Sequence, residues 1–416
     1  MRLVLPLILL NIISGNQLWM IGPLFVGQII LWFAVMICGV AMLGYLGGRV
    51  WIYVLLLTIP LSRVMEALTG SPTMTLLYLI SLNSVFFMSG IIAATREPDL
   101  VFRQVRTFLV ACVPMMFLQV AGAGSWTQAL NTEYWVDELQ VGKEKEVYPT
   151  LFRTEENIKY GVGQGRPAGF LHANNVLSLV IIFGFVLQMG RWKDKHVSAT
   201  DLVIVATMVL AMAKIVIAAF LIMVLYMLVN GDSTQRSRVW RLLLVTAICY
   251  GVYAFLFPGL FAMQLSVYKI MYSITVRLTD MLAAFTALDA SQQAAILDLL
   301  GDASFYNYAS ESDVGGLSGY ASILMMWPLL LGAMLIGIPV FWLGARKLRK
   351  ISSRRELTAW LALIAVVMFP AAVPFFRAQL YWFVFGFAAV PLIALLMPRT
   401  SARLLKPSII ARRHAI

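Results

Sequence analysis

The feature that most constrains this chain is a series of long apolar segments. A transmembrane helix needs about 20 mostly apolar residues, and a bilayer leaves helices as the usual way to satisfy every backbone hydrogen bond. The sequence therefore predicts an all-α polytopic membrane protein with about twelve transmembrane helices, forming one integral membrane domain over residues 1–416. The predicted helices lie at residues 3–20, 24–47, 50–62, 73–95, 106–122, 171–190, 201–213, 215–230, 241–261, 321–345, 357–375 and 378–398.

Composition excludes several other classes of protein. Hydrophobic residues make up 61% of the chain and charged residues 12%, whereas soluble domains are roughly 45–50% apolar and about 25% charged. A soluble enzyme, a disordered chain and a nucleic-acid-binding domain are all incompatible with these values. The net charge of +12 is therefore not explained by nucleic-acid binding. It is explained by the membrane topology described next.

The segment 202–229 decides how the chain is threaded, because Lys214 lies near its middle. Basic residues flank it on both sides, Arg191 to Lys195 before and Arg236 to Arg238 after. Lys and Arg concentrate in cytoplasmic loops, so both flanks are expected on the same side. The segment must then cross twice, as two short helices with Lys214 in the outer turn.

This threading separates the charges by side. It places 22 of the 32 Lys and Arg residues and 6 of the 20 Asp and Glu residues in the cytoplasm, which leaves 10 basic and 14 acidic residues outside. The balance of +16 inside and −4 outside predicts that both termini are cytoplasmic. The excess of positive charge is thus an orientation signal and gives no reason to expect a nucleic-acid partner. Together with the apolar composition, it leads us to expect a polytopic inner-membrane protein.

The chemistry is expected at the outer face. Every predicted cytoplasmic loop is short, and the sequence contains no phosphate-binding G-x-x-x-x-G-K-[ST] motif. Two long segments lie outside, at about 122–169 and 261–320, and short amphipathic helices are expected within them. No group of residues has metal-ligand spacing, so neither a metal nor a cofactor is predicted.

Each outer loop carries candidate functional residues. The first ends on three closely spaced glycines followed by Arg166 at the start of a membrane helix; the alternative is a flexible linker with an interfacial arginine. In the second, Arg277 and Asp280 share a helical face, and a strip rich in acids and tyrosines follows; the alternative is a solvated loop on the membrane surface. Arg166, Lys214 and Arg277 together have the charge needed to bind a pyrophosphate, although each alone is compatible with an interfacial anchor.

One short motif, together with the overall layout, resembles a known family. Twelve crossings, cytoplasmic termini and two large outer loops resemble the O-antigen polymerase and O-antigen ligase superfamily of membrane glycosyltransferases (the Wzy/WaaL type). The local similarity is in Arg166-Pro-Ala-Gly169-Phe-Leu-His172-Ala-Asn174-Asn175, which looks like the family's arginine-x-x-glycine segment leading into an asparagine-bearing helix. The family often has Ser-Arg where this chain has Ala213-Lys214. The charge is kept, but the bidentate fork of arginine is lost.

The resemblance implies metal-independent glycosyl transfer at the periplasmic face, from an undecaprenyl-pyrophosphate-linked glycan. Ligases usually carry a histidine in the second outer loop, and this loop has none, which favours a polysaccharide polymerase. An O-antigen ligase, a lipid-linked oligosaccharide flippase or transporter, and a non-catalytic assembly scaffold remain as alternatives. The implied partners are donor and acceptor glycolipids, membrane lipids, a chain-length regulator and a flippase. The expected substrate-binding residues are Arg166, Gly169, His172, Asn174, Asn175, Lys214 and Arg277; the expected general base is one of Asp280, Asp302, Glu311 and Asp313.

Overall fold

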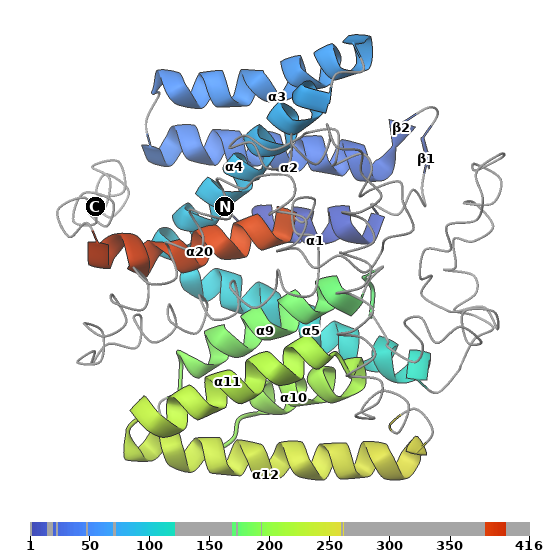
Figure 1. Cartoon of the computed structure of the whole chain (residues 1–416), viewed down its shortest axis with the longest axis vertical. Coiled ribbons are helices and arrows are strands. Elements are labelled where there is room, and N and C mark those ends of the chain that lie inside the picture. The colour runs from blue at the N-terminus through green and yellow to red at the C-terminus, as the bar shows by residue number, and fades with distance from the viewer. Residues whose placement is uncertain are drawn as a thin grey trace, which may run out of the picture. The chain divides into compact units, whose positions relative to one another are not determined.

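The protein was examined as a computed structural model (Figure 1), which describes residues 2–14, 20–21, 24–46, 49–69, 72–120, 169–171, 174–192, 194–258, 261 and 379–396. Within these ranges the chain forms helices and one pair of two-residue antiparallel strands, β1 (Met20–Ile21) and β2 (Leu24–Phe25). The helices are α1 (Val4–Ser14), α2 (Val26–Leu46), α3 (Val50–Thr69), α4 (Pro72–Arg96), α5 (Pro98–Val120), α9 (Asn174–Met189), α10 (Ala199–Ala211), α11 (Lys214–Asn230), α12 (Ser233–Leu256) and α20 (Gln379–Leu396).

The described helices support the prediction of a helical membrane protein. Four of them are long and apolar enough to cross a membrane: Val50–Thr69, Leu77–Arg96, Pro98–Leu118 and Ser233–Leu256. Ten of the twelve predicted segments coincide with a helix in the described ranges, while 321–345 and 357–375 lie outside those ranges. The number of crossings and the side on which the termini lie stay predictions.

Helix α3 differs from its predicted extent of 50–62. It continues through Pro60 to Thr69, although proline lacks the N–H that a helix needs. Hydroxyl groups beside the proline bond to backbone carbonyls: Thr58 donates to Val54 O at 2.7 Å and Ser62 to Thr58 O at 2.6 Å. Membrane helices often continue through a proline, since local adjustments and neighbouring helices can satisfy the carbonyl that it leaves without a partner.

The chain divides into two compact units, and each is described by itself. Unit 1 comprises Met1–Ile37 and Pro98–Ser266, and unit 2 comprises Cys38–Glu97 and Val267–Ile416. Among the described helices, α1, α5 and α9 to α12 belong to unit 1. Unit 2 contains α3, α4 and α20, and the boundary between the units falls within α2.

Unit 2 is organised around a close crossing of α4 and α20. A Cβ atom added to Gly90 would overlap the carbonyl oxygen of Phe383, and one added to Gly386 would overlap the carbonyl oxygen of Phe87. The rings of Phe87 and Phe385 pack edge to face beside the crossing, with centroids 5.3 Å apart. Small residues at such crossings let two backbones touch, which is how membrane helices gain packing energy in an apolar solvent.

Unit 1 packs α9, α10 and α11 between longer helices. Figure 1 shows α5 on one side of this group and α12 on the other, with both extending further to the right than α9 and α11. At about 1.5 Å per residue, α9, α10 and α11 are roughly 20–25 Å long, whereas α5 and α12 are about 35 Å long. Only the latter two match the 30 Å or so of a hydrocarbon core.

Candidate functional site

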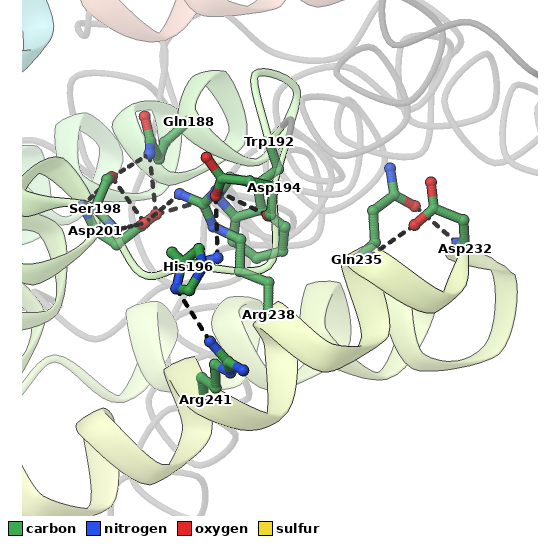
Figure 2. Close-up of polar contacts among 10 residues, drawn as sticks. All are labelled: Gln188, Trp192, Asp194, His196, Ser198, Asp201, Asp232, Gln235, Arg238 and Arg241. Atoms are coloured by element: carbon green, nitrogen blue, oxygen red, sulfur yellow. Dashed lines mark hydrogen bonds and ion pairs between the residues drawn. The ribbon is translucent and has the colours of Figure 1, made fainter.

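The most extensive polar network in the described part of the chain centres on Asp201, close to the start of α10 (Figure 2). The side chain of Asp201 is fully buried. Its Oδ1 accepts from Gln188 Nε2 at 3.0 Å and from the indole N–H of Trp192 at 3.1 Å. Its Oδ2 accepts from the backbone N–H of Ser198 at 2.7 Å and from the hydroxyl of Ser198 at 2.8 Å. Each carboxylate oxygen therefore accepts two hydrogen bonds from this part of the chain.

Arg238 of α12 completes this network, which we call the Asp201 cluster (Gln188, Trp192, Asp194, Ser198, Asp201 and Arg238). Its Nη2 lies 2.5 Å from Asp201 Oδ2, and its Nη1 lies 3.0 Å from Asp194 Oδ1. The guanidinium also sits over the Trp192 ring, 5.0 Å from the centroid. Arg238 is only 4% exposed, so the pair is held in a desolvated setting where ionic hydrogen bonds are strong and unpaired charges are costly.

The Asp201 cluster fixes the path of the intervening chain. It joins the end of α9 to the starts of α10 and α12, so α10 and α11 must leave this end and return to it. This confirms that both flanks of the segment 202–229 lie at the same end. Asp99 and Arg191 also pair there, at 2.6 Å, and Gln104 of α5 donates to Arg2 O at 2.6 Å. We call this end of unit 1 the basic end.

The helices that begin at the basic end are capped by side chains. Ser198 and Asp201 form a capping box at the start of α10, and Asp232 and Gln235 form another at the start of α12. Such caps supply acceptors for the first N–H groups of a helix. Helix α11 begins differently, because its N-cap residue Ala213 makes no side-chain hydrogen bond.

The break before α11 is deeply buried and unusual in its backbone. Met212 takes the left-handed conformation with φ 47° and ψ 29°, which is uncommon for a residue with a side chain. Met212 is 0% exposed and Ala213 is 2% exposed. Non-helical backbone inside a membrane protein is tolerated where protein or a polar cavity surrounds it, and strained conformations of this kind cluster at functional sites.

Lys214 is the first residue of α11. Among the described residues of unit 1, it is the only charged side chain away from the basic end. The N-terminus of a helix carries a partial positive charge, which disfavours a cation in the first turn. Helix α11 therefore places a lysine where its own electrostatics oppose one. A helix N-terminus and an ammonium group together make this point strongly attractive to an anion.

The depth of Lys214 follows from the Asp201 cluster, which gives α9, α10 and α12 a common starting level. Along α10, Lys214 lies about 15–20 Å from Asp201, and along α12, Tyr250 lies about 18 Å from Arg238. On α9, Ser178 lies about 15 Å from Gln188 by the same rise. We call this common height the Lys214 level. It lies roughly 10 Å short of the far end of α12.

Gly169 reaches a similar level from another direction. It has φ +62°, and a Cβ atom added to it would lie 2.9 Å from Cys112 Sγ on α5. Cys112 lies about 20 Å along α5 from Asp99 at the basic end. Residues 169–171 therefore lie at about the height of Lys214, and Leu171 among them is fully buried.

We compared the chain with protein-family models, curated proteins and solved structures, and found no match.

Of the predicted site residues, Lys214 and Gly169 lie at about the same height in unit 1. Asn174 and Asn175 are the first two residues of α9, which is where the sequence predicted them. The other predicted site residues lie outside the described residues; these are Arg166, His172, Arg277, Asp280, Asp302, Glu311 and Asp313.

The sequence analysis missed the Asp201 cluster and counted its charged members only as cytoplasmic residues. Two signals were present. Ser198-x-x-Asp201 has the spacing of a capping box, and Arg238 has helical spacing with Leu242 and Thr246, which are buried on the same side of α12. Nothing local to either segment indicates that Asp201 and Arg238 meet.

Gly169 provides a test of the geometry near α5. Replacing Gly169 by alanine should destabilise the protein by about 1–3 kcal/mol, because the new side chain would have both a strained φ and a clash with Cys112. A double variant with Cys112→Ala should recover only the part due to the clash. Thermal unfolding of the detergent-purified protein measures both changes.

The matched control is Gly251→Ala. Gly251 is exposed on α12, and an added Cβ would meet nothing within 4 Å. This change should be neutral or stabilising by up to about 1 kcal/mol, since alanine favours helix. Equal effects at Gly169 and Gly251 would contradict the placement of Gly169 against α5.

Proposed function

We propose that this protein is a bacterial inner-membrane glycosyltransferase that joins undecaprenyl-pyrophosphate-linked repeat units at the periplasmic face, as a polysaccharide polymerase does. The support from sequence is the resemblance around Arg166 to Asn175, together with two long outer loops. In this proposal the basic end of unit 1 faces the cytoplasm, in keeping with the preference of Lys and Arg for that side. The opposite end faces the periplasm, where the glycolipid substrates gather.

The observation that carries the proposal is the setting of Lys214. It combines an ammonium group with a helix N-terminus that has no side-chain cap, at a buried break and at a height similar to that of Gly169. An anion stabilises both positive groups at once. A pyrophosphate attached to a membrane lipid is an anion that can reach this level from the bilayer.

The reaction follows from that assignment. A hydroxyl oxygen of the acceptor sugar attacks the anomeric carbon of the donor, and the bond from that carbon to the pyrophosphate oxygen breaks. Lys214, with Arg166 and Arg277, stabilises the negative charge that develops on the departing undecaprenyl pyrophosphate. The acceptor proton passes to one of the acids Asp280, Asp302, Glu311 or Asp313. No metal takes part in this scheme.

Substitution of Lys214 tests the proposal. Lys214→Ala should lower the amount of polymer at least tenfold, because it removes the charge that stabilises the leaving group. Lys214→Arg keeps the charge and should retain a substantial part of the activity. The measurement is the polymer ladder made from lipid-linked repeat units by the full-length protein in proteoliposomes, together with the ladder formed in cells.

The matched control is Lys195→Ala, which removes an exposed lysine at the basic end and should leave the ladder unchanged. Normal polymer from Lys214→Ala would refute the role of this residue. If the wild-type protein forms no glycosidic bond and a deletion strain accumulates finished polymer on the undecaprenyl carrier, the ligase alternative replaces the polymerase.

A transporter of lipid-linked oligosaccharides is the second candidate. The specific observation in its favour is the buried break between α10 and α11, because transporters bind anionic groups at the N-termini of broken membrane helices. Movement of labelled glycolipid across vesicles, without formation of a glycosidic bond, would decide for this candidate. Formation of polymer in the same vesicles would decide against it.

A further inference from the structure

Two buried tyrosine hydroxyls in α12 stand out because they make no hydrogen bond within the described structure. The hydroxyl oxygens of Tyr250 and Tyr253 are buried, and neither has a hydrogen-bond partner among the described residues. Tyr253 is only 3% exposed, so membrane headgroups do not reach it. Buried hydroxyls are nearly always hydrogen-bonded, and an orphaned one calls for an explanation such as a missing ligand.

The ring of Tyr253 lies on the inward face of α12. It follows Val239, Leu242 and Thr246 along the same buried stripe of α12. This stripe starts next to Arg238, which belongs to the Asp201 cluster at the basic end. Phe257 packs against the Tyr253 ring, with centroids 5.3 Å apart. Tyr250 lies one turn before Tyr253, and residues three apart share a helical face.

Their height matches that of the break before α11. Tyr250 and Tyr253 lie about 18 and 22 Å along α12 from Arg238, against about 15–20 Å for Lys214 from Asp201. Helical side chains lean toward the N-terminus of their helix, which here is the basic end. The hydroxyl of Tyr253 is thereby brought down toward the Lys214 level, in a unit where α11 packs against α12.

We propose that Tyr250 and Tyr253 donate hydrogen bonds to phosphate oxygens of the anion that binds at Lys214 and the N-terminus of α11. This inference rests on the proposed function and extends it, because it adds two neutral donors to a cationic site. Tyrosine provides an O–H donor at neutral pH that does not compete with Lys214 for the negative charge. Hydrogen bonds from such donors to a charged acceptor are among the stronger ones in proteins.

The test measures how undecaprenyl pyrophosphate stabilises the full-length protein in detergent. Titrating it against the melting temperature gives an apparent affinity, and Tyr250→Phe and Tyr253→Phe should each lower that affinity by about tenfold. Without the ligand, both variants should be as stable as the wild type or slightly more stable, because phenylalanine removes an unpaired hydroxyl. Tyr53→Phe is the control, since Tyr53 is 53% exposed on α3, and it should titrate like the wild type.

Several outcomes separate this inference from the proposed function. If the wild type is stabilised and both phenylalanine variants titrate identically to it, the tyrosine contacts are refuted while the function stands. If the wild type is stabilised but makes no polymer from lipid-linked repeat units, the proposed function fails and an anion site with its tyrosines remains. If vesicles of phosphatidylglycerol stabilise the protein equally, with the same loss in the variants, the bound phosphate belongs to a lipid headgroup. If no phosphate-bearing lipid stabilises the wild type, both proposals are refuted.

Discussion

Replacing Asp201 by alanine should cost about 3–5 kcal/mol of stability, one of the two largest effects expected in this protein. The change leaves the Arg238 guanidinium buried with only Asp194 as a charged partner. It also removes one acceptor of Gln188 and the acceptor of the indole of Trp192. The loss of stability therefore comes mainly from polar groups that are left buried without a partner, and less from the strength of the original ion pair.

Two further variants show whether the loss has this cause. Arg241→Ala removes an exposed arginine that contacts His196 at 3.3 Å, and should change the stability by less than about 0.5 kcal/mol. The double change Asp201→Leu with Arg238→Met replaces the pair by apolar groups and should recover much of the loss. Thermal unfolding in detergent measures the three variants against the wild type. A double variant as unstable as Asp201→Ala would show that packing, and not the orphaned charge, governs the cluster.

Replacing Gly386 by valine should separate α4 from α20 and destabilise unit 2 by about 2–3 kcal/mol, at the upper end of the range for overpacking. The new side chain would meet the backbone of Phe87, which cannot move aside as a side-chain tip can. Gly90→Val should act similarly, because its neighbour is the backbone of Phe383. The yield of folded protein in detergent and its melting temperature measure the effect.

Gly44→Ala is the control for these changes. Gly44 is also in unit 2 and in a helix, but an added Cβ would meet nothing within 4 Å. The alanine should be neutral or slightly stabilising. A Gly386→Val protein with normal yield and melting temperature would contradict the close crossing of α4 and α20.

Local signals in the sequence were sufficient for the described helices. Apolar runs located them because a membrane helix must be apolar over its whole length, and the basic flanks of 202–229 indicated that the chain returns, as the contact of Arg238 with Asp201 confirms. The predicted segment 50–62 ends too early, because α3 continues through Pro60 to Thr69. Inside a bilayer a helix has no water with which to exchange hydrogen bonds, so it tolerates proline better than it would in solution.

The candidate site was less accessible from sequence. The charge of Lys214 is visible in the sequence, but its position at a helix N-terminus beside a buried break depends on the left-handed turn at Met212, for which methionine gives no signal. The heights of Tyr250 and Tyr253 relative to Lys214 depend on the Asp201 cluster, which brings together residues from three helices. Pairings of that kind arise from tertiary packing, which a single sequence does not encode locally.

The crossing of α4 and α20 has a consequence for how the protein is made. The described helices α9 to α12 of unit 1 follow one another along the chain and can assemble as they leave the ribosome. Helix α4 must instead wait for residues 379–396, nearly 300 positions later, before the backbone at Gly90 meets the backbone of its partner helix. The face of α4 that carries Gly90 is thus without its partner helix for most of translation. Unit 2 is complete only when α20, the last described helix, has been made.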